Sequence, residues 1–174
     1  MAHFEIKTAE ISDKLEEFSA GDSVSLTGYI YTARDSAHKR FVQMIEKGEK
    51  LPMEGDFIIY YAGPTPNKEG HVIGSCGPTT SGRMDFFSET MMKNGMKCMI
   101  GKGKRADFVV DAMKENKCVY LVAVGGAGAF VADCVKSLEV VCFEELGCES
   151  VKKLYVENFE VFVAIDVLGN SLYI

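Results

Sequence analysis

Glycines and prolines in the middle of this chain constrain its fold more than any other feature. Three of the four prolines fall between residues 64 and 78, and residues 63–66 read GPTP, which excludes a helix there. Residues 74–85 read GSCGPTTSGRMD, in which glycine and proline fix the backbone of a tight loop. The sequence therefore predicts irregular structure in the middle of the chain, with regular elements on both sides.

Segments typical of strands and helices alternate on either side of this loop. β-Branched and aromatic residues, or short apolar runs, favour strands at 4–9, 22–32, 57–62, 98–100, 119–124 and 140–143. Apolar spacing favours helices from Asp35 or Ser36, either of which can cap the first of them, to near Gly48, and over 84–92, 107–115 and 125–135. The tail, 160–167 and 171–174, resembles a hairpin. Since several strands are short and the chain ends look antiparallel, we predict an α/β fold with one mixed-sheet domain spanning residues 1–174.

Composition and charge narrow the class of protein. The chain has 174 residues, 47% of them hydrophobic and 25% charged, which is typical of a globular domain with a real core. A net charge of −6 argues against a general nucleic-acid binder. No apolar run approaches the roughly 20 residues of a membrane span, and the N-terminus lacks the pattern of a signal peptide. We therefore expect a cytoplasmic protein with no nucleic-acid or membrane partner.

The six cysteines do not have the spacing of a metal site. There is no C-x-x-C, and five residues separate the closest pair, Cys142 and Cys148. We therefore expect reduced, mostly buried thiols and no metal ligands within this chain. Cys76 differs from the others because it lies inside the 74–85 loop, and its role is open at this point.

Arginine placement predicts a carboxylate site. The chain has four arginines beside fifteen lysines, and Arg83 follows the adjacent hydroxyls of Thr79 and Thr80 in the tight loop. A guanidinium matches a carboxylate with two parallel hydrogen bonds, where lysine offers only a point charge. Main-chain N–H groups, two hydroxyls and an arginine can thus converge on one small anion.

Other candidates stand at the predicted strand-to-helix junctions, where ligand sites of α/β sheets collect. Arg34 is either an anion ligand or a surface arginine paired with Asp35 or a nearby acid. Lys102, between two glycines, is either an anion contact or a solvated loop lysine. His38 fits a helix-orienting or core histidine better than a catalyst. Residues 125–128 read GGAG, an incomplete dinucleotide motif that packing explains better than a nucleotide.

Four ordered motifs closely resemble the β subunit of class I fumarase and L-tartrate dehydratase, which is the C-terminal domain of single-chain fumarases. They read GYIYTARDSAHKR at 28–40, YAGP at 61–64, GPTTSGRMD at 77–85 and GKG at 101–103. The resemblance covers nearly the whole chain. It implies a swivelling β/β/α fold and an iron–sulfur hydro-lyase that interconverts fumarate and L-malate, or dehydrates L-tartrate.

The same resemblance implies the roles of individual residues and of a partner. It makes Arg34, Arg83 and Lys102 ligands of the substrate carboxylates, adds a hydrogen bond from Thr80, and makes Thr79 the candidate base. Asp85 and His38 are candidates for supporting Thr79. The [4Fe-4S] cluster is implied to be held by three cysteines of a cysteine-rich α subunit, so this chain is expected to work in a hetero-oligomer and to bind no cofactor or metal itself.

Two alternatives remain open from the sequence. The substrate is either fumarate or tartrate, because both need the same carboxylate clamp. The chain could also be a non-catalytic domain that binds a dicarboxylate or docks a partner. A nucleotide-binding enzyme is a distant third.

Overall fold

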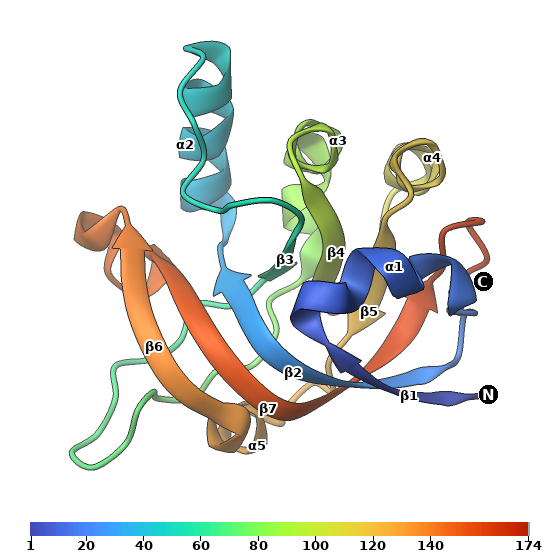
Figure 1. Ribbon diagram of the computed structural model, residues 1–174. Helices are drawn as coiled ribbons and strands as arrows, with labels where there is room; N and C mark the ends of the chain where they lie inside the picture. The colour runs from blue at the N-terminus through green and yellow to red at the C-terminus, as the bar shows by residue number, and fades with distance from the viewer. Residues whose placement is uncertain (174) are drawn as a thin grey trace.

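All strands of the described part of the chain, residues 1–173 of this computed structural model, belong to one sheet (Figure 1). Its order is β1-β2-β3-β4-β5-β7-β6. The pairs from β1 to β5 are parallel, whereas β7 runs antiparallel to β2, β5 and β6. The predicted mixed α/β sheet is confirmed. The strands are β1 (His3–Lys7), β2 (Ser23–Thr32), β3 (Phe57–Tyr60), β4 (Met96–Gly101), β5 (Val119–Val122), β6 (Val135–Cys142) and β7 (Val151–Ile165).

The sheet closes on itself through β2 and β7. β2 pairs with β3 and also with β7, and β7 pairs in turn with β5, which closes a ring of five strands. Helices α2, α3 and α4 lie on one side of this ring (Figure 1). The helices are α1 (Ile11–Lys14), α2 (Asp35–Glu46), α3 (Asp85–Lys93), α4 (Asp107–Asn116) and α5 (Gly128–Cys134), and the 3-10 turns are Thr8–Glu10, Leu15–Glu17, Ser81–Met84 and Glu144–Glu149.

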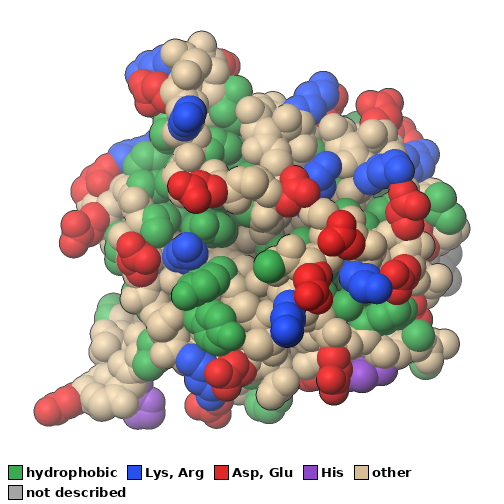
Figure 2. All heavy atoms as spheres, viewed as in Figure 1, with side chains coloured by type: hydrophobic (Ala, Val, Ile, Leu, Met, Phe, Trp, Pro, Cys, Tyr) green, Lys and Arg blue, Asp and Glu red, His purple; other side chains and the backbone are tan. Residues whose placement is uncertain are grey.

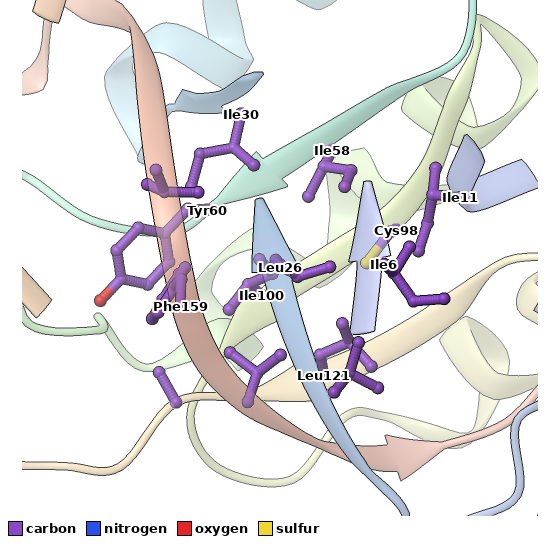
Figure 3. Packing of buried hydrophobic residues seen from close by; sticks show 14 of the residues in the cluster. Ile6, Ile11, Leu26, Ile30, Ile58, Tyr60, Cys98, Ile100, Leu121 and Phe159 are labelled. Carbon is purple, nitrogen blue, oxygen red and sulfur yellow. The ribbon is translucent and has the colours of Figure 1, made fainter. Parts of the chain in front are cut away.

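Alternation along the strands divides the buried side chains into two clusters. In β3, Ile58 and Tyr60 belong to the cluster inside the ring, while Phe57 and Ile59 belong to the cluster beneath the helices. Figure 3 shows side chains of the inner cluster from β2, β3, β4, β5 and β7 gathered in one interior space. A strand buried on both faces is expected to be apolar throughout, as β3 is.

The start of α2 corrects one prediction. Asp35 or Ser36 was expected to cap this helix, but Arg34 is the N-cap residue and makes no side-chain capping bond. Asp35 is the first helical residue, and its carboxylate instead binds Arg83. The Ser36 hydroxyl donates to Glu149 at 3.2 Å. Both side chains are therefore used in tertiary contacts that the local sequence does not specify.

The C-terminal third differs most from the prediction. The helix expected to reach Val135 ends at Cys134, and β6 begins at Val135 and is longer than the strand predicted at 140–143. The tail hairpin is reduced to one bridge between Ile165 and Ser171, because residues 151–165 form one long strand that pairs with β2, β5 and β6. Ile174, the last residue of the predicted hairpin, lies outside the described residues.

The surface is mixed in charge. On the face shown in Figure 2, acidic and basic side chains are interspersed, with apolar side chains between them. Within residues 1–173, no helix combines the length and the apolar character needed to cross a bilayer.

Candidate active site

Three of the predicted site segments meet where parallel strands end. Arg34 lies two residues beyond the end of β2, and Lys102 follows β4 directly. The tight loop runs between the ends of β3 and β4: the Thr79 amide donates to the Tyr61 carbonyl at 2.6 Å, and the Ser81 amide donates to the Lys102 carbonyl at 2.9 Å. Thr80 and Lys102 also form an isolated parallel bridge. This is the edge at which α/β sheets bind ligands.

Buried hydrogen bonds hold the loop against the sheet. The Lys102 amide donates to the Ser81 hydroxyl at 3.1 Å, and this hydroxyl is bonded in turn to the Tyr120 hydroxyl at 2.9 Å. The Tyr120 hydroxyl also donates to the Gly103 carbonyl at 2.9 Å. Ser81 and Tyr120 are fully buried. The backbone of Thr80 and Lys102 is thus fixed from below, while the side chains of both residues are exposed.

A buried ion pair fixes the end of the same loop. Arg105 Nε donates to Asp85 at 2.7 Å, and the second carboxylate oxygen of Asp85 accepts from the Ala106 amide at 3.0 Å. The Arg105 guanidinium also donates to the Ser88 hydroxyl at 2.6 Å and lies over the rings of Tyr61 and Tyr120, 5.5 and 5.0 Å from their centroids. Asp85, predicted to support Thr79, is therefore bonded to Arg105, a residue for which the sequence predicts no role.

Arg83 has an exposed side chain and forms an ion pair with Asp35. Its Nη2 lies 2.9 Å from Asp35 Oδ2, and its side chain is 53% exposed. The contact links the loop to the residue directly after Arg34. The two predicted carboxylate-binding arginines are thus brought to neighbouring positions from segments about fifty residues apart in the sequence.

Arg34 packs against backbone at the end of β3. A side chain on Gly63 would lie 2.7 Å from Arg34 Nη1, so glycine is needed for this close approach. Arg34 Nε is 4.0 Å from Glu149, beyond hydrogen-bond distance, and has no hydrogen-bond partner among residues 1–173. The guanidinium is therefore positioned but only loosely paired.

His38 orients the start of α2. Its Nδ1 is 2.7 Å from the Arg34 carbonyl, which can only accept, so Nδ1 carries the proton and Nε2 does not. Complete burial lowers the pKa of His38 to about 4, and the ring lies against Phe41, Tyr61 and Phe87. At neutral pH this histidine is uncharged, and its contacts are those of a helix-orienting core residue.

The cysteines are structural where they are buried. All six are free thiols, and Cys76 is fully buried, with burial raising the pKa of its thiol to about 12. Its carbonyl accepts from the Tyr60 hydroxyl at 2.6 Å, and its amide donates to the Gly128 carbonyl at 3.0 Å. Cys76 therefore packs the loop onto the core. Gly128, whose carbonyl accepts from the Cys76 amide, contributes to the same packing. Cys142 is half-buried and Cys148 is exposed. Among residues 1–173, no three His, Cys, Asp or Glu side chains gather as a metal-binding group.

The fold and this edge define a class of protein: an α/β domain that places arginine, lysine and hydroxyl side chains at the ends of parallel strands. The "Fumarase C-terminus" family model matches residues 1–174, so the chain belongs to that family, as the resemblance indicated.

Named relatives are of two kinds. The chain is 38% identical to "Fumarate hydratase class I, anaerobic" of Escherichia coli (strain K12), over 94% of this chain and 30% of that protein. It is 40% identical to "Putative L(+)-tartrate dehydratase subunit beta" of Methanocaldococcus jannaschii, over 91% of this chain and 85% of that protein. It is 32% identical to "L(+)-tartrate dehydratase subunit beta" of Escherichia coli (strain K12), over 92% and 82% respectively. The chain thus spans about 30% of the class I fumarate hydratases and most of the β subunits.

Proposed function

We propose that residues 1–174 form one domain, the β part of a hydro-lyase that acts on a four-carbon dicarboxylate. Fumarate and L-malate are the preferred pair, and L-tartrate is the alternative. The proposal is supported by family membership and by relatives named for the addition or removal of water. The observation that carries it is the placement of Arg34, the Thr79–Thr80 loop, Arg83 and Lys102 at one edge of the sheet.

The basic groups at this edge suit a dianion. Arg34, Arg83 and Lys102 bind the substrate carboxylates, and the exposed Thr80 hydroxyl adds a hydrogen bond. Holding both ends of the substrate places its two central carbons in a fixed position, which lowers the entropic part of the activation barrier. The same cations stabilise the charge that develops on a carboxylate when the neighbouring carbon loses its proton.

Thr79 is the proposed base. In dehydration, the base takes the proton from the carbon next to a carboxylate, and hydroxide leaves the other carbon with the electrons of the C–O bond. Thr79 is half-buried, and its backbone is fixed by the Tyr61 carbonyl. His38 and Asp85 support the site through what they bind: His38 holds the Arg34 carbonyl, and Asp85 holds Arg105 beneath the loop.

The rest of the site belongs to a partner. Because the chain spans about 30% of the class I fumarate hydratases, we propose that a cysteine-rich α subunit supplies the remainder and carries a [4Fe-4S] cluster. When bound there, the cluster's open iron would supply Lewis-acid assistance to the departing hydroxyl. The exposed side chains of Thr80, Arg83 and Lys102 fit a half-site that a second protein covers. A cytoplasmic location is part of the same proposal.

The test is recovery of the assembled protein. The chain would be tagged in its own host and purified without oxygen, and the complex examined by mass spectrometry, iron analysis, and fumarate and tartrate assays. We expect a cysteine-rich partner, bound iron and turnover of one substrate. A chain recovered alone, free of iron and binding malate by itself in a titration, would replace this proposal with a dicarboxylate-binding module.

A further inference from the structure

Asp35 ties one candidate substrate ligand to the segment that carries the other. It is the first residue of α2 and directly follows Arg34, and its Oδ2 lies 2.9 Å from Nη2 of Arg83. The contact therefore bridges the β2–α2 junction and the 77–85 loop. The backbones of the two segments are also held at the end of β3, where the Ala33 amide donates to the Tyr60 carbonyl and the Thr79 amide donates to the Tyr61 carbonyl. The ion pair adds a restraint between side chains.

The acid is the fixed member of this pair. The Asp35 side chain is 27% exposed against 53% for Arg83, and its Oδ1 is enclosed, with no hydrogen-bond partner among residues 1–173. Asp35 also stands at the N-terminus of α2, where the helix dipole favours a carboxylate. The long Arg83 side chain thus contacts the shorter and more buried carboxylate of Asp35. One nitrogen of the guanidinium is engaged, and the remaining donors are available to a substrate.

Arg34 offers a contrast within the same site. Its acidic neighbour, Glu149, lies 4.0 Å from Nε and makes no hydrogen bond to it, whereas the contact of Arg83 with Asp35 has hydrogen-bond length. Arg34 is instead placed by packing against Gly63. Arg83 is more exposed, and Asp35 is the acid with which its guanidinium forms an ion pair.

We propose that Asp35 is a positioning residue that aims Arg83 at a carboxylate of the substrate. This rests on the proposed function and adds a residue to it. The negative charge of Asp35 also repels a dianion, but water screens that repulsion at a partly exposed position. An arginine ordered before binding loses less side-chain freedom when the substrate arrives, and this effect dominates.

The decisive experiment uses Asp35→Asn in the assembled enzyme. We expect KM for the dicarboxylate to rise about tenfold and kcat to stay within about threefold, because a ligand of the substrate is disordered while the base is intact. Asp35→Glu keeps the charge and should recover most of the loss. Asp107→Asn is the matched control, since Asp107 also begins a helix, α4, and should leave both constants unchanged. An unchanged or lower KM in Asp35→Asn would overturn the proposal.

A measurement on this chain alone separates this inference from the proposed function. Arg83 should react faster with phenylglyoxal in Asp35→Asn than in the wild type, as followed by peptide mass spectrometry. Equal rates would show that Asp35 does not hold Arg83. A wild-type assembly that turns over neither fumarate nor tartrate would instead defeat the proposed function, whatever the phenylglyoxal result.

Discussion

The Ser81 hydroxyl occupies the space in which a side chain at Gly101 would lie, because a Cβ at position 101 would overlap the Ser81 oxygen. Gly101 ends β4 and directly precedes Lys102, and Ser81 directly follows Thr80. Because that hydroxyl also accepts from the Lys102 amide and bonds to Tyr120, the loop can be held on the sheet only while residue 101 has no side chain.

Gly101→Ala should therefore destabilise the chain and loosen the site. Overpacking of this kind costs about 1–3 kcal/mol of unfolding free energy, measured by urea denaturation. Gly125→Ala is the matched control, because nothing lies within 4 Å of a Cβ there. Combining Gly101→Ala with Ser81→Ala should restore part of the loss. If Gly101→Ala and Gly125→Ala proved equally stable, the close approach described here would be wrong.

Arg105→Met should be one of the most destabilising substitutions in the chain. It would leave the Asp85 carboxylate buried without its cation, which costs about 3–5 kcal/mol. Lys93→Met, which breaks the exposed pair with Glu89, should change the unfolding free energy by no more than about 1 kcal/mol. The double variant Arg105→Met, Asp85→Asn should be more stable than Arg105→Met alone. Similar losses for Arg105→Met and Lys93→Met would contradict the buried pair.

Stability should fall with acid because of His38. Its pKa is about 4 in the folded chain and about 6.5 in the unfolded one, so the unfolded state binds more protons between these values. The stability is therefore present above pH 6.5 and is lost as the pH falls toward 4. Between pH 7 and pH 5 the loss should be about 2 kcal/mol. The unfolding free energy would be measured by urea denaturation at several pH values. His38→Gln should remove this pH dependence, whereas replacing the exposed His71 with Gln should retain it. An equal pH dependence in all three proteins would refute the assignment.

Thr79→Ala should lower kcat in the assembled enzyme far more than it changes KM. Removal of a general base typically costs about 10²–10⁴ in rate, while the carboxylate ligands remain. Thr90→Ala, at a half-buried position on α3, is the control and should be close to wild type. Thr79→Ser keeps a hydroxyl and should retain part of the activity. A rise in KM with normal kcat would make Thr79 a binding residue.

The candidate site was more predictable than the contacts that build it. Glycine, proline and adjacent hydroxyls are local signals, so the 77–85 loop and Arg83 could be identified without a structure. Lys102 between two glycines and Arg34 at a strand-to-helix junction are also local features. The buried Arg105 carried no such signal, because its partner Asp85 is twenty residues away and its aromatic neighbours are Tyr61, directly after β3, and Tyr120 of β5.

The sequence by itself determined the 77–85 loop and most strands and helices before residue 125, because apolar period, β-branched content and turn residues act over a few positions. It did not determine the start of β6 at Val135 or the first part of β7. Only the tertiary structure decided which of these segments meet. β2 pairs with β7 across more than one hundred residues, with Ser23 opposite Phe162, and Asp35 was free to cap its own helix but binds Arg83 instead. Such pairings depend on how the sheet closes and on which partners burial leaves available, and neither is encoded in local periodicity.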